Sequence, residues 1–471
     1  MKDVYESPLS SRYATKEMLK IFSPDTRYGL WRKLWLSLAK AEKSLGLDIT
    51  DEQIAEMSEH LYDIDYECVK EREKVVKHDV MAHVYAFGKV APKAAGIIHL
   101  GATSCFVTDN SDLVIYKSGL ISLKTQLLRV MRDLSVFADK YKATPTLAYT
   151  HYQSAQFTTV GKRAAIWLYN FESDLKNLDF VIDNMKLLGS RGTTGTEASF
   201  LKLFDGDGEK VDRLNEAICK DFGFSSIVDV CGQTYPRKMD YEILSVLAGI
   251  AQSAYKFAND VRLLQHDGQI EEPFEEDQIG SSAMAYKRNP VKCERVCSLS
   301  RYIMSDIMNV QLTAANQWLE RTLDDSANRR ISMPEGFLCA SAVLELLDYI
   351  ASGLKVNLKI IEKFLEKETP FVATENLLME AVKRGGDRQK LHEKIRKLSM
   401  QVTISVRDGG ENDLIDRLLS EEEFAFAKDL KDSLLEAKNY VGRCPEQVEK
   451  YLKKLEPLFV DIDENHAKID V

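Results

Sequence analysis

Apolar residues recur at three- and four-residue steps over long stretches of this chain. Between residues 242 and 265 they form a stripe on one face over about six helical turns. The same spacing places Trp31 and Trp35 on one face of residues 28–47, and Gly46 is a typical helix stop. No stretch shows sustained two-residue alternation, so strands should be minor. Further long helices are expected near 112–139, 158–188, 290–320 and 336–365.

Five long segments between about residues 110 and 360 predict one helical bundle. At roughly 150 residues per domain, 471 residues favour about three domains. We therefore expect a helical domain over 1–110, the long-helix bundle over 111–356 and shorter, charge-rich helices over 357–471. Many Ala, Ser and Leu residues on the long helices leave apolar faces for other chains, which predicts an oligomer.

The composition narrows the class of protein. Lys and Arg number 63 against 73 Asp and Glu, a net charge of −10, which argues against a nucleic-acid-binding protein. A local cation cluster can still bind an anionic substrate. No apolar run approaches a membrane span, and the first residues lack the apolar stretch of a secretory signal. Eight scattered cysteines favour reduced thiols, so a cytoplasmic protein without membrane partners is expected.

Segment 267–290 interrupts the helical pattern. Six acidic residues precede Gly280 and a pair of serines, and a Lys-Arg-Asn-Pro run follows. Long irregular loops in compact domains are usually functional or disordered, and this one would suit an anion-binding lid. The alternative is an exposed linker between two helices. The acidic run itself is expected to be a solvated face.

Other polar interruptions have weaker individual signals. A lone histidine such as His151 is by default structural, and the hydroxyl-rich segment 99–112 is typical of a helix start. The glycines of 189–199 follow no strand and do not match a dinucleotide fingerprint, so a nicotinamide site is rejected. No HExxH pattern occurs, so no metal site is expected. The arginine-rich linker 321–330 would suit carboxylates or phosphates, or is a charged surface loop.

SSAMAYKRNP at 281–290 resembles the signature of the fumarase/aspartase superfamily, GSSxMPxKxNP. Its Tyr-Lys-Arg version is similar to the branch that acts on succinylated purine nucleotides, rather than to fumarase or argininosuccinate lyase. Further segments resemble that branch in the same order: Ser11-Arg12-Tyr13, HLGATSC at 99–105, THYQSAQ at 150–156, RGTTGTEASF at 191–200, QTYPRKMD at 233–240 and the linker 321–330.

The resemblance implies a nearly all-α, three-domain fold. Four subunits would pack their long helices into a twenty-helix core, and each active site would take residues from three subunits. The implied reaction is β-elimination of fumarate from adenylosuccinate, giving AMP, and from SAICAR, giving AICAR, in purine nucleotide biosynthesis. No metal or organic cofactor is implied. Two alternatives remain, another fumarate-releasing lyase of the argininosuccinate or fumarase type, and a catalytically silent structural relative.

The resemblance also assigns roles to residues. Elimination needs a base for a C–H beside a carboxylate, cations for the developing charge and an acid for the departing nitrogen. By resemblance Ser281 is the base, His151 is the acid and Glu294 orients the histidine, while Lys287 and Asn289 bind the succinyl carboxylates. We infer that backbone N–H groups and Lys287 lower the cost of a Ser281 alkoxide when the lid closes.

Further residues resemble substrate contacts of that branch. Those similar to nucleotide and phosphate contacts are Arg12, Tyr13, Arg295, Arg321, Ser326 and Arg330. The remaining substrate contacts would be Lys77, His78, Asp79, Thr103, Ser104, Thr150 and Gln233. Three positions depart from the pattern: Ala285 replaces a proline, Lys77 an arginine and Glu197 a glutamine.

Overall fold

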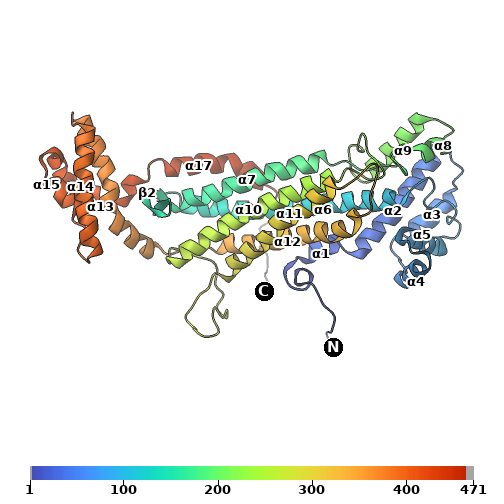
Figure 1. The fold of residues 1–471 in the computed structure, drawn as a ribbon, viewed down its shortest axis with the longest axis horizontal. Coiled ribbons are helices and arrows are strands. Elements are labelled where there is room, and N and C mark those ends of the chain that lie inside the picture. Colours follow the sequence, from blue (N-terminus) through green and yellow to red (C-terminus); the bar gives the residue numbers. More distant parts are fainter. Residues whose placement is uncertain (1–2, 463–471) are drawn as a thin grey trace.

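The computed structural model describes residues 3–462 and is built mainly from helices. Five long helices lie lengthwise in one elongated bundle (Figure 1). The predicted stripe on 242–265 is buried, with residues such as Ile243, Leu247 and Phe257 in the core, which explains why this helix lies at the bundle centre. The bundle helices are α6 (Ser104–Lys140), α7 (Val160–Asn184), α10 (Lys238–His266), α11 (Val291–Ala315) and α12 (Asp325–Gly353). The mainly helical prediction is confirmed.

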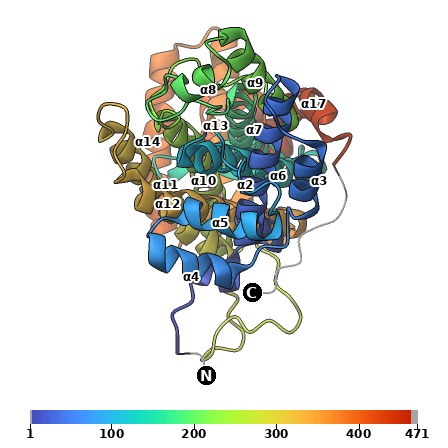
Figure 2. The ribbon, with the colours of Figure 1, turned by 90° about the vertical axis from the view of Figure 1, so that its right-hand side faces the viewer.

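Shorter helices cover one end of the bundle (Figure 2). The predicted helix over 28–47 is α2, which starts at the Ser23 cap and ends just before Gly46, where φ is +103°. The elements at this end are α2 (Pro24–Ser44), α3 (Asp51–Glu59), α4 (Tyr66–Val76), α5 (Asp79–Val90), α8 (Ala198–Leu203) and α9 (Gly208–Asp221). The first two elements, η1 (Leu9–Tyr13) and α1 (Lys16–Ile21), lie along the side of the bundle against α12.

A β-hairpin lies at the opposite end of the bundle (Figure 1). Strands β1 (Pro145–Thr150) and β2 (Gln153–Thr159) are antiparallel, and Thr150 pairs with Gln153. His151 and Tyr152 therefore form a two-residue turn, with φ of +51° and +60°. Such turns favour glycine or asparagine, so two bulky residues here store backbone strain.

The prediction of one helix over 336–365 is wrong. The chain leaves α12 at Gly353, forms β4 (Lys355–Val356) against β3 (Ile270–Glu271), and starts α13 (Leu358–Lys383). A Cβ on Gly353 would lie 2.4 Å from Cγ of Pro273. The Asn357 side chain donates to the Gly268 carbonyl at 2.8 Å and thereby holds the break in place. Apolar periodicity continues because the helices on both sides of the break are partly buried.

The C-terminal segment first forms a separate small core and then returns to the bundle. Residues such as Leu377, Leu414 and Phe424 build that core. Its elements are α13, α14 (Arg388–Arg407), α15 (Leu414–Ser420), η2 (Glu422–Leu430) and α16 (Lys431–Leu434). The chain then continues through η3 (Ala437–Tyr440), α17 (Cys444–Leu455), which packs along α7, and η4 (Glu456–Phe459) (Figure 1). The domain limits stay a prediction: residue 110 lies within α6 and residue 357 precedes α13.

One helix in the described part of the chain, α12, is long and apolar enough to cross a membrane. Its most apolar stretch is 78% buried inside the protein, as in the core helix of a bundle. All eight cysteines are free thiols.

A polar cluster holds α17 against α7. The buried Glu172 carboxylate accepts from Lys454 Nζ at 2.8 Å and from Tyr451 Oη at 3.0 Å, and it pairs with Lys176 at 2.6 Å. Burial alone would raise the pKa of Glu172, but these donors lower it to about 2. The ionised carboxylate therefore stabilises the docked helix.

We predict that Glu172→Gln lowers the free energy of unfolding by about 1.5–3 kcal/mol at pH 7, because hydrogen bonds to a charged group are lost. Since the folded pKa lies near 2, the difference from wild type should shrink as pH falls from about 4.5 towards 2. Urea unfolding at several pH values measures this. The exposed Glu362→Gln, which breaks a surface pair with Lys359, is the matched control and should change little. A pH-independent difference would contradict the account.

Candidate active site

Nine of the predicted site residues line one cavity of about 550 Å³. It opens at the end of the bundle where α5, α6 and α12 begin, so three helix starts supply its walls. This volume suits a ligand of nucleotide size. The nine residues are Lys77, His78, Asp79, Thr103, Ser104, Gln233, Arg321, Ser326 and Arg330.

The outer wall of the cavity is polar and prearranged. His78 caps α5 through Nδ1, which accepts from Met81 N at 3.4 Å, and its Nε2 lies 3.2 Å from Ser104 Oγ. Arg330 Nη2 donates to Asp79 Oδ2 at 2.9 Å. Asp79 thus holds the Arg330 guanidinium in place at the rim of the cavity.

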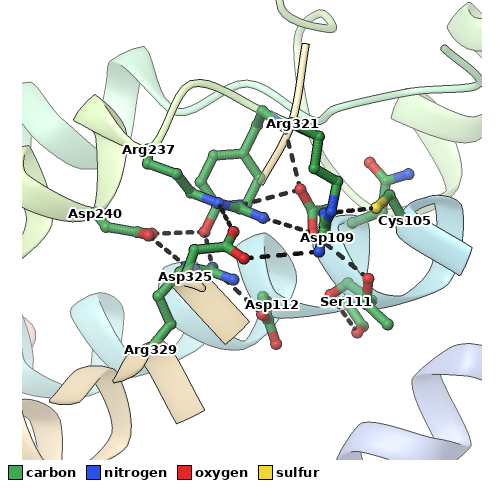
Figure 3. Close-up of polar contacts among 12 residues, drawn as sticks. Cys105, Asp109, Ser111, Asp112, Arg237, Asp240, Arg321, Asp325 and Arg329 are labelled. Atoms are coloured by element: carbon green, nitrogen blue, oxygen red, sulfur yellow. Dashed lines mark hydrogen bonds and ion pairs between the residues drawn. The ribbon is translucent and has the colours of Figure 1, made fainter. Parts of the chain in front are cut away.

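A buried network of charges forms the cavity floor (Figure 3). Arg237 binds Asp109 with both terminal nitrogens, at 3.0 and 3.2 Å, and its Nε donates to Asp325 Oδ2 at 2.7 Å. Arg329 Nε donates to Asp240 Oδ2 at 2.5 Å. The network joins α6, α10 and α12 and fixes their relative positions.

Burial and charge pairing shift the pKa values of the floor residues in opposite directions. Burial alone would lower the pKa of Arg237, yet neighbouring carboxylates, Asp109 first, raise it above its ordinary value. Burial also raises the pKa of the Asp112 carboxyl, which Arg27 and Arg329 partly offset. The arginines therefore stay charged within the protein, and unpairing one would leave a carboxylate buried without a partner.

The floor extends to Arg321. Its Nη1 lies 3.0 Å from Cys105 Sγ, and its Nη2 is 3.6 Å from Asp325 Oδ1. Burial raises the pKa of the Cys105 thiol to about 12, so the sulfur stays neutral and accepts from the guanidinium. Arg321 is thereby held over the floor at the cavity (Figure 3).

Two features of this region differ from the sequence interpretation. The expected linker 321–330 is irregular only at its start, because α12 begins at Asp325 and carries Ser326 and Arg330. The helix start expected within 99–112 is confirmed, since α6 begins at Ser104, but Asp109 lies buried in this helix as a member of the charge network. Arg329 belongs to the arginine-rich segment 321–330 noted in the sequence, but its buried pairing with Asp112 and Asp240 was not predicted. The signal that could have indicated it is a charged residue within an apolar helix.

A second group of predicted residues lies between α10 and α11, in the segment we call the signature loop, residues 273–289. Ser281 Oγ accepts from the Met284 N–H at 3.1 Å and the Ala283 N–H at 3.4 Å. Asn289 Nδ2 donates to the Gly280 carbonyl at 2.7 Å. Lys287 is exposed beside this turn. The turn forms although Ala285 replaces the usual proline.

The loop's close packing explains its glycine. A Cβ on Gly280 would lie 2.1 Å from the Lys287 carbonyl oxygen, so only glycine fits there. Beyond the loop, Glu294 and Arg295 lie in the first turns of α11, and the Arg295 guanidinium lies 5.6 Å from the Tyr13 ring centroid. Arg12, also in η1, is exposed.

The third group is the hairpin tip. His151 and Thr150 are exposed there, at the bundle end away from the cavity (Figure 1). Within one described chain, His151 does not line the cavity that holds Arg321. One protomer therefore carries three separate groups of the predicted site residues.

Two charged positions have structural roles. Glu272 of the acidic run is buried, and its carboxylate accepts from the Lys292 and Cys293 N–H groups at 3.0 and 2.8 Å. The expectation of a solvated acidic face is therefore wrong for this residue, which caps α11. Glu197, the departure from a glutamine, pairs with Arg191 at 3.0 Å and accepts from Asn215 at 3.1 Å.

Comparisons with known proteins identify the family of the chain. Residues 13–305 match a family model described as lyase, and residues 370–451 match one described as adenylosuccinate lyase C-terminus. An adenylosuccinate lyase of Saccharomyces cerevisiae is 49% identical, covering 100% of this chain and 99% of its own length. One of Schizosaccharomyces pombe is 49% identical over 96% of this chain and 94% of its own. The chain belongs to the adenylosuccinate lyase family.

Solved structures extend the likeness in fold. A 3-carboxy-cis,cis-muconate lactonizing enzyme from Pseudomonas putida matches with a TM-score of 0.83 at 22% identity, over 96% of this chain and 99% of that one. At this identity the match concerns the fold alone. This member of the adenylosuccinate lyase family therefore shares the fumarase/aspartase fold that the sequence motifs indicated.

We predict that Arg237→Leu lowers the free energy of unfolding by about 3–5 kcal/mol, because Asp109 and Asp325 would stay buried without their partner. Chemical denaturation measures the loss. Arg396→Met, which removes an exposed arginine paired with Glu393, is the control and should change stability little. Equal stability of the Arg237 variant and wild type would contradict a structural role for the network.

Proposed function

We propose that this chain catalyses elimination of fumarate from adenylosuccinate, giving AMP, and from SAICAR, giving AICAR. The observation that carries the proposal is one cavity in which three predicted cations and three predicted hydroxyl groups lie above a rigid charged floor. They are Lys77, Arg321, Arg330, Thr103, Ser104 and Ser326. Relatives that are 49% identical over nearly their full length are named for the first of these reactions. The geometry supplies binding groups suited to a phosphorylated, anionic substrate.

In this proposal the nucleotide occupies the cavity. Arg321 and Arg330 are held by Cys105 and Asp79, so they bind the phosphate without losing much side-chain freedom. Lys77 lies in a left-handed conformation (φ +53°) at the end of α4, which places its cation at the rim. A lysine there binds as a point charge, without the forked contact of the arginine it replaces.

Ser281 serves as the base. The Met284 and Ala283 N–H groups point at its Oγ, so a developing alkoxide would accept two backbone hydrogen bonds. Ser281 takes the proton from the succinyl carbon beside a carboxylate. The C–H electron pair then forms the C=C bond of fumarate as the C–N bond breaks. Lys287 and Asn289 hold the succinyl carboxylates that carry the transient charge.

His151 serves as the acid. The departing purine nitrogen keeps the electron pair of the broken C–N bond and takes a proton from the imidazole, which Glu294 orients. Both proton transfers then use side chains of the protein, so the proposal needs no metal or organic cofactor. Among residues 3–462, no cluster of three or more His, Cys, Asp or Glu could hold a metal ion.

The active form is a homotetramer with shared sites. The separation of His151, Ser281 and the cavity within one chain supports this proposal. Copies packed side by side would bring the three groups together into a complete site. Long helices carry exposed apolar residues for such packing, including Met308 (54% exposed) and Leu312 (56%) on α11 and Ile331 (61%) on α12. Free thiols support a cytoplasmic location.

The substrate assignment has a direct test. Purified protein mixed with adenylosuccinate should release AMP and fumarate, and SAICAR should yield AICAR and fumarate. Argininosuccinate should release no fumarate. It has no phosphate group, so the arginines of the cavity could not bind and position it. Chromatography of the products measures each reaction. Fumarate from argininosuccinate alone would favour the other branch, and no product from any substrate would favour a silent relative.

Shared sites predict complementation. His151→Ala and Ser281→Ala should each lower kcat by more than about 1,000-fold, since each removes an acid or base and its hydrogen bond. Mixed tetramers of the two variants should regain activity, because some sites then contain a native His151 and a native Ser281 from different chains. Mass spectrometry verifies that tetramers are mixed. Mixed tetramers without regained activity would contradict sharing.

A further inference from the structure

The signature loop projects from the bundle between α10 and α11 (Figures 1 and 2). Ser281, Lys287 and Asn289 lie on this loop, and Tyr286 beside Lys287 is 84% exposed. A loop so far from the core has few contacts to fix its position. The contacts at its base, where the two arms leave the bundle, therefore decide where Ser281 lies.

Gln265, in the last turn of α10, contacts both arms with one side chain. Its Oε1 accepts from the Glu272 N–H at 3.0 Å, just before the outgoing arm. Its Nε2 donates to the Arg288 carbonyl at 3.0 Å, on the returning arm. Arg288 directly follows Lys287. One amide thus uses both its acceptor and its donor to hold the arms together.

Lys292 closes the base from the other side. This lysine is only 7% exposed, in the first turn of α11. Its Nζ donates to Gln278 Oε1 at 2.8 Å and to the Pro273 carbonyl at 3.4 Å, both on the outgoing arm. The Nζ also lies 4.9 Å from the Tyr349 ring centroid. Gln278 precedes Ser281 by three residues, so this contact reaches close to the proposed base.

Further contacts make the base of the loop rigid. Tyr349 Oη donates to Glu275 Oε1 at 2.7 Å, which ties the outgoing arm to α12. The Glu272 carboxylate fixes the start of α11 directly beneath Lys292. The lysine charge is thus buried among oxygen acceptors, where replacement by an apolar group removes several contacts at once.

We propose that Gln265 and Lys292 are positioning residues, which hold the arms of the signature loop together and thereby set the position of Ser281 for the elimination. The inference rests on the proposed function of Ser281. Neither side chain needs to touch the substrate. A loop freed at its base would spend less time with Ser281 against the substrate carbon, and small misplacements of a reacting group cost up to about 100-fold in rate.

Gln265→Glu is the sharpest test, because it keeps the shape of the side chain but places an oxygen opposite the Arg288 carbonyl. We expect kcat for adenylosuccinate to fall about 10- to 100-fold with little change in KM, since the nucleotide cavity is untouched. Lys287 and Arg288 are already exposed in the held loop, and a freed loop can adopt the extended backbone that a protease needs, so trypsin should cut the native variant faster after these two residues. Gln252→Glu, the same change at an exposed position of α10, should match wild type in both measurements.

Lys292→Met should show the same loss of kcat and the same faster cleavage. Lys292→Arg should stay close to wild type in both measurements, because it keeps the charge and the N–H donors. If Lys292→Met does not fold, the measurements on Gln265→Glu still test the proposal. Wild-type kcat and cleavage in Gln265→Glu would overturn the proposal, and so would a loss of kcat with unchanged cleavage. If wild type itself releases no fumarate, the proposed function fails, and cleavage alone reports whether these residues hold the loop.

Discussion

The charge network beneath the cavity is the constraint on which the rest of the site depends. Arg237 and Arg329 bind Asp109, Asp240 and Asp325, and all five side chains are almost fully buried. Apolar contacts between helices tolerate small sliding, whereas forked hydrogen bonds require one register. Replacing such a network by apolar residues often costs no stability, so its value here is the fixed geometry of three helices. Two of these helices, α6 and α12, carry residues of the cavity walls, so the network also fixes the positions of those walls.

The structure separates rigid binding groups from groups held on projecting segments. The cavity is built on helix starts, where Asp79 and Cys105 hold two arginines in place. By contrast, His151 lies on the tip of a strained hairpin and Ser281 on a long loop. Projecting segments can reach a neighbouring chain, which a helix face within the bundle cannot. This division fits an enzyme whose sites are completed only by assembly.

Much of the fold follows from the sequence, because apolar stripes at helical spacing must be buried. That rule located α2, α6, α7, α10 and α11. It failed at Gly353, where close packing against Pro273 ends α12 although apolar residues continue beyond the break. It also gave no sign of the hairpin, since the strands are short and their turn consists of His151 and Tyr152, which local preferences disfavour.

The candidate site was predictable as a set of residues and not as a geometry. The resemblance to the family pointed to nine of the residues that line the cavity, and the structure places them together. Local patterns could not show that Asp112 and Arg329 meet, because the residues lie 217 positions apart and pair only once the bundle is packed. Nor could they show that Glu272 is a buried cap, since its acidic neighbours resemble a solvated surface.

In the proposed mechanism, an imidazole from one chain and a hydroxyl from another act on the same substrate bond. A structure of the assembled protein with AMP and fumarate bound tests this most directly. We expect His151 of one copy and Ser281 of a second to lie within about 3.5 Å of the products, in a cavity lined by Arg321 of a third. Finding both side chains remote from the bound products in every site would contradict it.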